Sequence, residues 1–300
     1  MKIGVNQFCF PMRYGVREAM EAAKRLGFDS LELCLTADEA TIASRPSGGV
    51  VDSLDIGSYY NPLLNLSSTQ AQMRQLKRMA EDIGMAISSI GGIVSFSIFP
   101  LTSADSAVAQ KSMDAVKRML DAAQILSARK VLVIPGMLTQ EMDYAASYAT
   151  AQERIARLAD YAPEIDVLIE NVWNNMLYSP LELTRFVDET GRGNVGIYFD
   201  VANARRFGYP QRWIDAMGKR VRGYHLKDYR MSVDNINGFT NVLDGDVDYP
   251  AVFDAIEKSG YDGDLVVELI PPARFQVETS LAYANKTLRN FLRNREENTP

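Results

Sequence analysis

Short, continuously apolar runs alternate along this chain with longer segments whose apolar positions recur at helical spacing. Eight runs rich in Val, Ile, Leu and aromatic residues predict β-strands at residues 2–6, 30–35, 85–90, 130–135, 165–170, 195–199, 221–224 and 264–269. Most of the runs are nearly continuously apolar and do not alternate with polar residues. This pattern is typical of parallel strands that are buried on both faces.

Helical periodicity fills the intervals between the strands. It predicts helices at residues 16–26, 68–83, 103–127, 146–161, 180–189, 210–217, 249–258 and 277–292. Gly27 and Gly84 mark helix ends, and Pro180 stands in the first turn of its helix. Residues 36–67 are rich in Ser, Gly and Asp and are expected to be irregular, and the polar tail from about residue 293 is expected to fray.

Strand and helix alternate eight times, which indicates a parallel sheet covered by helices. Closure of the strands is the economical arrangement at this length, so we predict an α/β fold, a single (β/α)8 TIM barrel, with residues 1–300 as one domain. A doubly wound open sheet is the alternative. It is disfavoured because NQFCFP, and not GxGxxG, follows the first strand, and because the chain has no Walker loop.

Four consecutive predicted strands end in residues that can bind a metal: Glu170, Asp200, His225 and Glu268. His225 is the only histidine in the chain. In a TIM barrel the C-terminal strand ends meet at one mouth, so these side chains are expected to converge. A single such carboxylate is more often a rim ion pair or a helix cap. Three buried together need a common cation, so the matching positions predict one divalent metal. Mn²⁺, Mg²⁺, Co²⁺ and Fe²⁺ suit this donor set, and no residue selects zinc.

The composition limits the partners of the chain. A net charge of −6 argues against a nucleic-acid partner, because phosphate binding requires concentrated Lys and Arg. Cys9 and Cys34 form no disulfide pattern and are expected to be buried, reduced thiols. The sequence shows no apolar leader and no run of 18 apolar residues, so we expect a cytoplasmic protein with no membrane partner.

Several motifs of the second half of the chain point to a known family. The chain resembles the xylose isomerase-like TIM-barrel superfamily, in particular its sugar (phosphate) isomerase/epimerase branch, which contains the ketose 3-epimerases. The resemblance covers nearly the whole chain. Its specific carriers are LIEN at 168–171, YFDVAN at 198–203, YHLKD at 224–228, LDGDVDYPAVFDAI at 243–256 and VVEL at 266–269.

The resemblance implies a mechanism and assigns residues to it. By motif, Glu170, Asp200, His225 and Glu268 would bind one divalent ion, with Mn²⁺ favoured and Co²⁺ or Mg²⁺ as alternatives. Glu170 and Glu268 would also act as an acid/base pair on a ketose or ketose phosphate. One takes the C3 proton, a cis-enediolate forms on the metal, and the other returns a proton to the opposite face.

Asn203 departs from the family pattern, because many relatives have a histidine at this position. An amide can bind a sugar hydroxyl but is a poor metal ligand. With a single histidine, the chain also cannot build the three-zinc cluster of the endonuclease-IV-like branch.

Residues near the strand ends are candidate substrate contacts: Glu32, Asn171, Trp173, Asn203, Lys227 and Arg230. Each has a structural alternative. Glu32 would form a buried pair with Lys or Arg, Lys227 would pair with Asp228, and Asn171 and Trp173 would pack a loop. Residues 59–68 are expected to form part of a lid, and residues 237–248 are expected to order a connection rather than to bind metal.

The leading hypothesis is a metal-dependent isomerase or epimerase that acts at C3 of a ketose or ketose phosphate. An inosose dehydratase-like lyase and a non-catalytic sugar-binding barrel are the alternatives. The expected partner is a small-molecule sugar, and a homo-oligomer, dimer or tetramer, is compatible with the family.

Overall fold

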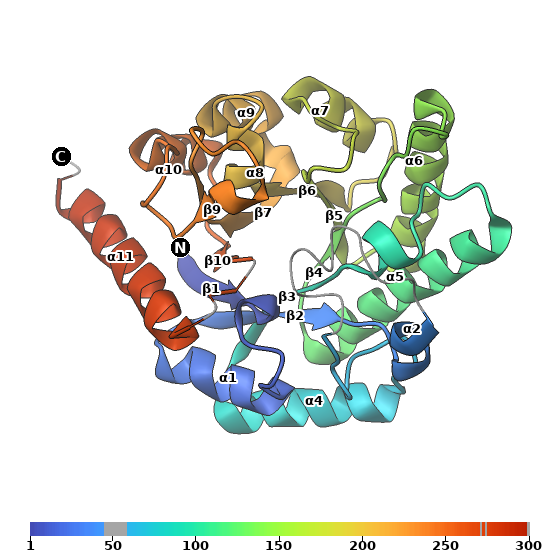
Figure 1. Ribbon diagram of the computed structural model, residues 1–300, viewed down its shortest axis with the longest axis horizontal. Helices are drawn as coiled ribbons and strands as arrows, with labels where there is room; N and C mark the ends of the chain where they lie inside the picture. The colour runs from blue at the N-terminus through green and yellow to red at the C-terminus, as the bar shows by residue number, and fades with distance from the viewer. Residues whose placement is uncertain (45–58, 271, 274, 299–300) are drawn as a thin grey trace.

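Eight parallel strands close into a barrel in the computed structural model, which describes residues 1–44, 59–270, 272–273 and 275–298 (Figure 1). The strands are β1 (Lys2–Asn6), β2 (Ser30–Leu35), β3 (Ala86–Gly92), β4 (Lys130–Val133), β5 (Asp166–Glu170), β6 (Val195–Asp200), β7 (Val221–Leu226) and β10 (Asp264–Val267). Their order around the barrel is the order of the sequence, and β10 closes the ring by pairing with β1. The predicted TIM barrel is therefore confirmed. Much of the segment expected to be irregular, residues 45–58, lies outside the described residues.

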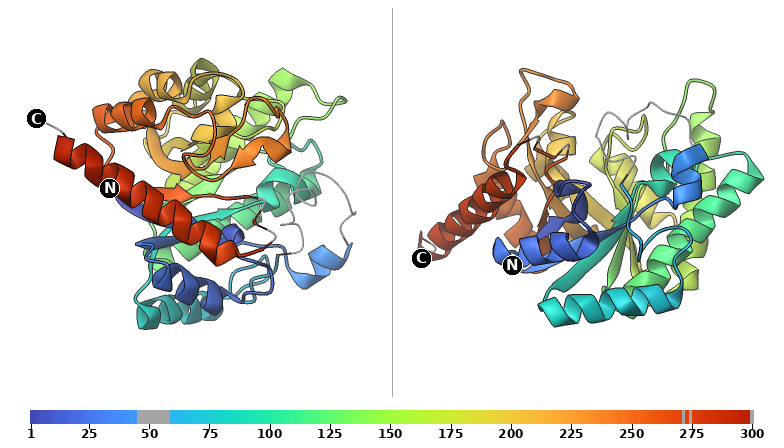
Figure 2. Two further views of the ribbon diagram at one scale, coloured as in Figure 1. Left: turned by 60° about the vertical axis from the view of Figure 1, so that its left-hand side comes forward. Right: turned by 60° about the horizontal axis from the view of Figure 1, so that its bottom comes forward.

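Helices surround the barrel and follow the strands in turn (Figures 1 and 2). They are α1 (Val16–Arg25), α4 (Gln70–Ile83), α5 (Ser106–Leu126), α6 (Tyr144–Tyr161), α7 (Pro180–Asp188), α9 (Pro210–Met217), α10 (Tyr249–Ser259) and α11 (Val277–Asn298). Local chemistry fixes their ends. Thr69 and Gln72 form a capping box at the start of α4, and Gly84 ends that helix in the left-handed conformation with φ 71°.

The sequence analysis missed the shortest elements. These are α2 (Glu39–Ser44), α8 (Val201–Arg205), the two-stranded hairpin of β8 (Asp228–Tyr229) and β9 (Phe239–Thr240), the 3-10 turns Gln7–Cys9, Gly218–Arg220 and Ile236–Gly238, and a π-helical turn at Val94–Ile98. Elements of this length are too short to display a hydrophobic period. Most of them lie in the loops that follow strands, and these loops build the mouth of the barrel.

Helix α11 continues to Asn298, whereas the sequence predicted its end near residue 292 and a frayed tail beyond it. Contacts with α10 explain the difference. The Arg295 guanidinium binds Asp254 at 2.6 Å and Glu257 at 3.0 Å. These ion pairs hold the polar end of α11 against its neighbour, beyond the helix end near residue 292 that the sequence predicted.

Two apolar clusters form the core. The larger one fills the space between the strands and the surrounding helices, and the smaller one lies within the barrel near its mouth. Glycine makes room for a large side chain there, because a Cβ at Gly223 would lie 2.7 Å from the Tyr198 ring. Among the described residues, no helix has the length and apolarity that crossing a bilayer requires.

Candidate metal centre

The four strand-end residues predicted to bind a metal meet at one mouth of the barrel. Glu170 and Asp200 are the last residues of β5 and β6, His225 is the penultimate residue of β7, and Glu268 directly follows β10. The sheet register sets Asp200 beside His225. Each residue offers one ligand atom, and these atoms lie within 4.8 Å of one another. The sheet therefore converts four matching sequence positions into one cluster.

His225 is held from both sides of its ring, and it is 1% exposed. Its Nδ1 lies 2.9 Å from Glu170 Oε1 and 3.3 Å from Glu268 Oε1, and its Nε2 lies 2.7 Å from Glu32 Oε1. When the imidazole is neutral, a proton shared between Nε2 and Glu32 leaves the Nδ1 lone pair facing the cluster. This arrangement orients a metal-ligating histidine.

Glu32 is fully buried in the middle of β2. Besides His225, its carboxylate accepts hydrogen bonds from Asn6 Nδ2 at 2.6 Å and from Ser89 Oγ at 2.5 Å. The expected alternative, a pair with Lys or Arg, is not formed. Although Glu32 lines the cavity, both of its oxygens are occupied by protein donors.

Burial and charge shift the pKa values of this cluster. Burial, and then the charge of Glu268, raises the pKa of Glu170 to about 7. Burial also acts to raise the pKa of Glu32, but the His225 charge and hydrogen bonds outweigh it and hold this pKa at about 2. Burial opposes protonation of His225, yet the facing carboxylates Glu268, Glu32 and Glu170 raise its pKa well above the usual range.

Lys227 bridges two of the carboxylates and is 3% exposed. Its ammonium donates to Asp200 Oδ2, and it donates to Glu268 Oε2 at 2.6 Å. The expected alternative, a pair with Asp228, is not formed, because Asp228 Oδ1 accepts from the backbone N–H groups of Tyr229 and Val247. Burial opposes the charge of Lys227, but the neighbouring carboxylates raise its pKa.

The donor set fits a divalent cation. Four buried or nearly buried carboxylates, including Glu32, face one imidazole and one ammonium. Carboxylate charge therefore exceeds the positive charge that the described side chains supply when His225 is neutral. A site with this charge excess and with oxygen and imidazole donors suits a hard or borderline ion such as Mn²⁺, Co²⁺ or Mg²⁺.

Asn171 and Asn203 brace the end of β6. The Asn171 amide exchanges hydrogen bonds with the Asp200 backbone, at 2.8 Å to its N–H and 2.9 Å to its C=O. Asp200 Oδ1 caps α8 by accepting from the Asn203 N–H at 2.6 Å, and Asn203 Nδ2 donates to the Asn171 C=O at 3.0 Å. Of the two, Asn203 lines the cavity, whereas Asn171 is buried behind it.

Trp173 lines the cavity, and its Nε1–H donates to the Asn203 C=O at 3.1 Å. Arg206, which the sequence analysis did not single out, also lines the cavity. Its guanidinium lies 4.6 Å from the Trp173 ring centre and 2.9 Å from Asp234. The pair of arginines after DVAN is the only sequence feature that marks this position.

Arg230 and the predicted lid do not line the cavity, although Tyr59 of the predicted lid packs against Phe8. The Arg230 side chain is exposed and donates to the Asp244 C=O at 3.3 Å, so it does not meet the other candidate contacts. No residue of 59–68 lines the cavity, and the segment instead bonds to Thr36 at the end of β2. Hydrogen bonds order the connection 237–248, in line with its predicted role. The Asp246 N–H donates to the Tyr229 C=O, and the Val247 N–H donates to the Asp228 carboxylate.

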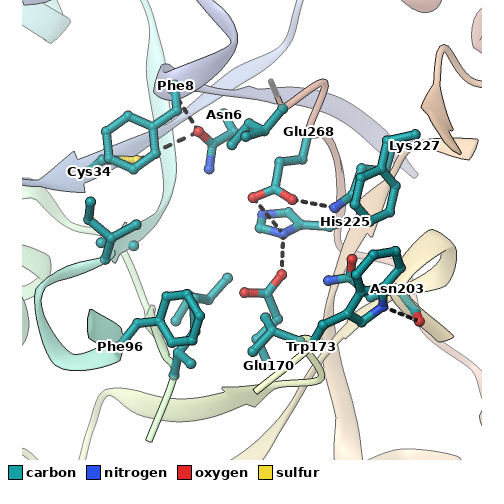
Figure 3. A pocket seen from close by; sticks show the side chains of 18 of the residues that line it. Asn6, Phe8, Cys34, Phe96, Glu170, Trp173, Asn203, His225, Lys227 and Glu268 are labelled. Atoms are coloured by element: carbon teal, nitrogen blue, oxygen red, sulfur yellow. Dashed lines mark hydrogen bonds and ion pairs between the residues drawn. The ribbon is translucent and has the colours of Figure 1, made fainter. Parts of the chain in front are cut away.

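The cavity at this mouth has a volume of about 340 Å³ and two unlike sides. Figure 3 shows Glu170, Glu268, His225 and Lys227 on one side, with Phe8, Cys34 and Phe96 facing them across the opening. The polar side carries the chemistry. A volume of this size accommodates a small-molecule ligand.

Known proteins share the architecture. The sequence profile of the family described as Xylose isomerase-like TIM barrel matches residues 20–291. The chain belongs to this family. No curated protein has a significant sequence match to the chain. The family assignment confirms the resemblance and the fold that the strand-end motifs predicted.

Solved structures of similar fold include several carbohydrate epimerases. A D-tagatose 3-epimerase-like protein is 18% identical and superposes with a TM-score of 0.75, with 99% of each chain covered. A D-allulose 3-epimerase from Methylomonas sp. is 16% identical with a TM-score of 0.70, covering 97% of this chain and 96% of the epimerase. An IolI protein with a bound zinc atom is 15% identical with a TM-score of 0.74 and 97% coverage of each chain. At these identities the likeness shows the shared fold.

Proposed function

We propose that this protein is a divalent-metal-dependent carbohydrate epimerase or isomerase that exchanges the proton at C3 of a ketose. The observation that carries this proposal is the pair Glu170 and Glu268, which approach His225 Nδ1 at 2.9 and 3.3 Å and line one cavity. Membership of the Xylose isomerase-like TIM barrel family and the likeness to ketose 3-epimerases support it.

Glu170, Asp200, His225 and Glu268 would hold the metal ion. When bound, such an ion polarises the substrate carbonyl and the neighbouring hydroxyl, and this Lewis-acid effect contributes several kcal/mol toward removal of an adjacent proton. Mn²⁺ is favoured by the donor set, with Co²⁺ and Mg²⁺ as alternatives. Glu32 positions the site, because it fixes the imidazole of His225 through Nε2.

The two glutamates supply the proton chemistry. In the metal-free protein, burial raises the pKa of Glu170 to about 7, so this carboxyl group can hold a proton near neutral pH before a cation binds. A glutamate positioned beside the substrate can act as a general acid or base. We assign one glutamate to removal of the C3 proton and the other to delivery of a proton on the opposite face of the substrate. Lys227, which donates to Glu268 and Asp200, places a positive charge where negative charge develops on the substrate oxygens.

Hydrogen exchange in D₂O tests the proposal. The metal-loaded protein is incubated with a panel of free and phosphorylated ketoses and inososes, and deuterium at C3 is followed by NMR. We expect exchange together with a new epimer, abolished by EDTA and restored by Mn²⁺ or Co²⁺. No exchange with any ketose despite stoichiometric metal would contradict it. Loss of water from an inosose without ketose epimerisation would favour the lyase alternative.

A further inference from the structure

The side of the cavity that faces the carboxylates is apolar, and we call it the apolar wall. It consists of Phe8, Ile93, Phe96, Leu132, Ile134 and Ile270. The wall draws on four strands or the loops that follow them, since Phe8 follows β1, Ile93 and Phe96 follow β3, Leu132 and Ile134 belong to β4 or follow it, and Ile270 follows β10. Figure 3 shows Phe8 and Phe96 across the opening from Glu170 and Glu268.

The wall is fixed by the fold. It belongs to the smaller apolar cluster, in which Phe8 packs edge-on against Tyr59 with ring centres 5.1 Å apart. Ile93 is the N-cap of the π-helical turn after β3 and Phe96 lies within that turn, a rare local structure that often occurs at functional sites. The apolar wall is therefore part of the packed core at the barrel mouth.

The polar groups beside the wall already have protein partners. Asn6 Nδ2 donates to Glu32, and Asn6 Oδ1 accepts from the Phe8 N–H at 2.7 Å and from Cys34 Sγ at 3.6 Å. Burial raises the pKa of the Cys34 thiol well above its usual range, so the thiol stays neutral. A substrate hydroxyl placed against the wall would lose water and find no free partner among these groups.

The two Lys or Arg side chains among the described residues that line the cavity are both engaged. Lys227 binds Asp200 and Glu268, and Arg206 pairs with Asp234 while its guanidinium lies over the Trp173 ring. Neither lies on the apolar wall. A phosphate at the substrate end that meets this wall would therefore be buried without a free counter-charge from the described residues.

We propose that the substrate is an unphosphorylated ketose whose far chain end, beyond C3, carries a methyl group in place of the terminal hydroxymethyl: a 6-deoxyketohexose. This inference rests on the proposed function, which places C2 and C3 at Glu170 and Glu268. From there the one-carbon arm at C1 stays beside the carboxylates. The three-carbon arm beyond C3 is the longer of the two, and in this proposal it extends toward the apolar wall, where Figure 3 shows Phe96 across the opening.

Matched sugar pairs test the inference. Each pair is a 6-deoxyketohexose and the ketohexose of the same configuration with its 6-hydroxyl, and kcat/KM is measured as C3 hydrogen exchange by the Mn²⁺-loaded protein. We expect the deoxy member of the best pair to be preferred on the order of 10- to 100-fold, the discrimination typical of burying an unpartnered hydroxyl in an apolar pocket. Saturation-transfer NMR should place the strongest protein contact on its methyl protons.

Two variants of one wall residue provide a matched control. Ile134→Val and Ile134→Thr both shorten the side chain, but Thr offers a hydroxyl where Val has a methyl group of nearly the same shape. We expect Ile134→Val to keep the preference for the deoxy sugar and Ile134→Thr to reduce it several-fold, because Thr supplies a hydrogen-bond partner. Equal ratios in both variants would contradict the inference.

The outcomes separate the two proposals. The apolar-end inference is overturned if the ketohexose, or its 6-phosphate, exchanges its C3 hydrogen as fast as the 6-deoxy sugar or faster. The epimerase proposal would then still stand. Absence of exchange with every member of the panel, at full metal loading, overturns the proposed function and with it this inference. Faster exchange and methyl contact with the deoxy member support both.

Discussion

The two ends of the barrel differ in how their charged side chains are paired. At the N-terminal ends of the strands, Asp166 on β5 pairs with Arg222 on β7 at 2.7 Å, and both side chains are about one-third exposed. Lys130 on β4 is nearly buried and donates to the Arg222 C=O and to the Tyr261 hydroxyl. Each of these three charged side chains has a protein hydrogen-bond partner. At the mouth, carboxylates outnumber the cations that face them.

This contrast separates a stabilising end from a reactive end. Paired, half-exposed charges hold neighbouring strands together and do little else. Buried carboxylates in excess cost folding free energy and are retained where they bind an ion or move protons. In TIM barrels the two kinds of residue belong at opposite strand ends.

Replacing a glutamate of the acid/base pair should have the largest effect. Glu170→Gln or Glu268→Gln is expected to lower C3 exchange by about 10²- to 10⁴-fold, because the proton donor or acceptor is lost. The midpoint of thermal unfolding of the metal-free protein should not fall, since one of several crowded carboxylates is removed. Glu153→Gln on exposed α6, where the side chain is 72% exposed, is the control and should keep full exchange. Normal exchange in the mouth variants would contradict the assignment.

Metal removal should come next. Binding to the folded state alone stabilises a protein by about 2.7 kcal/mol when the free ion is at 100 times its Kd. We therefore expect EDTA to lower the midpoint of thermal unfolding by several degrees and Mn²⁺ to restore it. In Asp200→Asn the response to Mn²⁺ should shrink strongly, whereas in Asp166→Asn at the other end of the barrel it should stay intact. Identical responses in both variants would place the ion elsewhere.

Glu32→Gln tests positioning through His225. Loss of the carboxylate that holds Nε2 should weaken metal affinity by about 10- to 100-fold, measured by competition with a chelator. If Glu32 had only a structural role, Glu32→Gln would lower the free energy of unfolding without changing the metal affinity. Asp166→Asn serves as the comparison, because it also removes a charged partner on a strand but lies far from the cavity. Unchanged affinity in Glu32→Gln would show that the imidazole needs no such support.

Arg222→Ala should have the smallest effect. A half-exposed ion pair contributes about 0.5 to 1 kcal/mol, so the free energy of urea unfolding should fall by roughly that amount. C3 exchange should stay near the parent value, because the residue belongs to the opposite strand ends. If Arg222→Ala strongly lowered C3 exchange but hardly changed the free energy of unfolding, the two barrel ends would not have separate roles.

The sequence predicted the barrel and the four-residue cluster for the same reason. A buried parallel strand is a continuous apolar run, so a single Glu, Asp or His at its end is visible, and parallel strands bring such ends together. Pro210–Met217 and Ser30–Leu35 were predicted with the bounds that the structure shows.

Contacts between distant segments were not predictable in this way. Glu32 binds His225, which lies 193 residues away, and no local pattern reveals which partner a buried carboxylate finds. Lys227 reaches Asp200 and Glu268 instead of its neighbour Asp228 because the strand turns its side chain into the barrel. Arg206 and Arg230 each follow a predicted strand end, but the short elements α8 and β8 direct the first toward the cavity and the second to solvent.

Anomalous diffraction from crystals of the Mn²⁺-loaded protein would show directly where the ion binds. The account predicts one strong manganese peak at the barrel mouth, coordinated by Glu170, Asp200, His225 through Nδ1, and Glu268. The peak should vanish from crystals of the Asp200→Asn variant. A fully loaded crystal whose only manganese peak lies outside this cluster, or in which Lys227 still bridges Asp200 and Glu268 with no metal beside them, would contradict it.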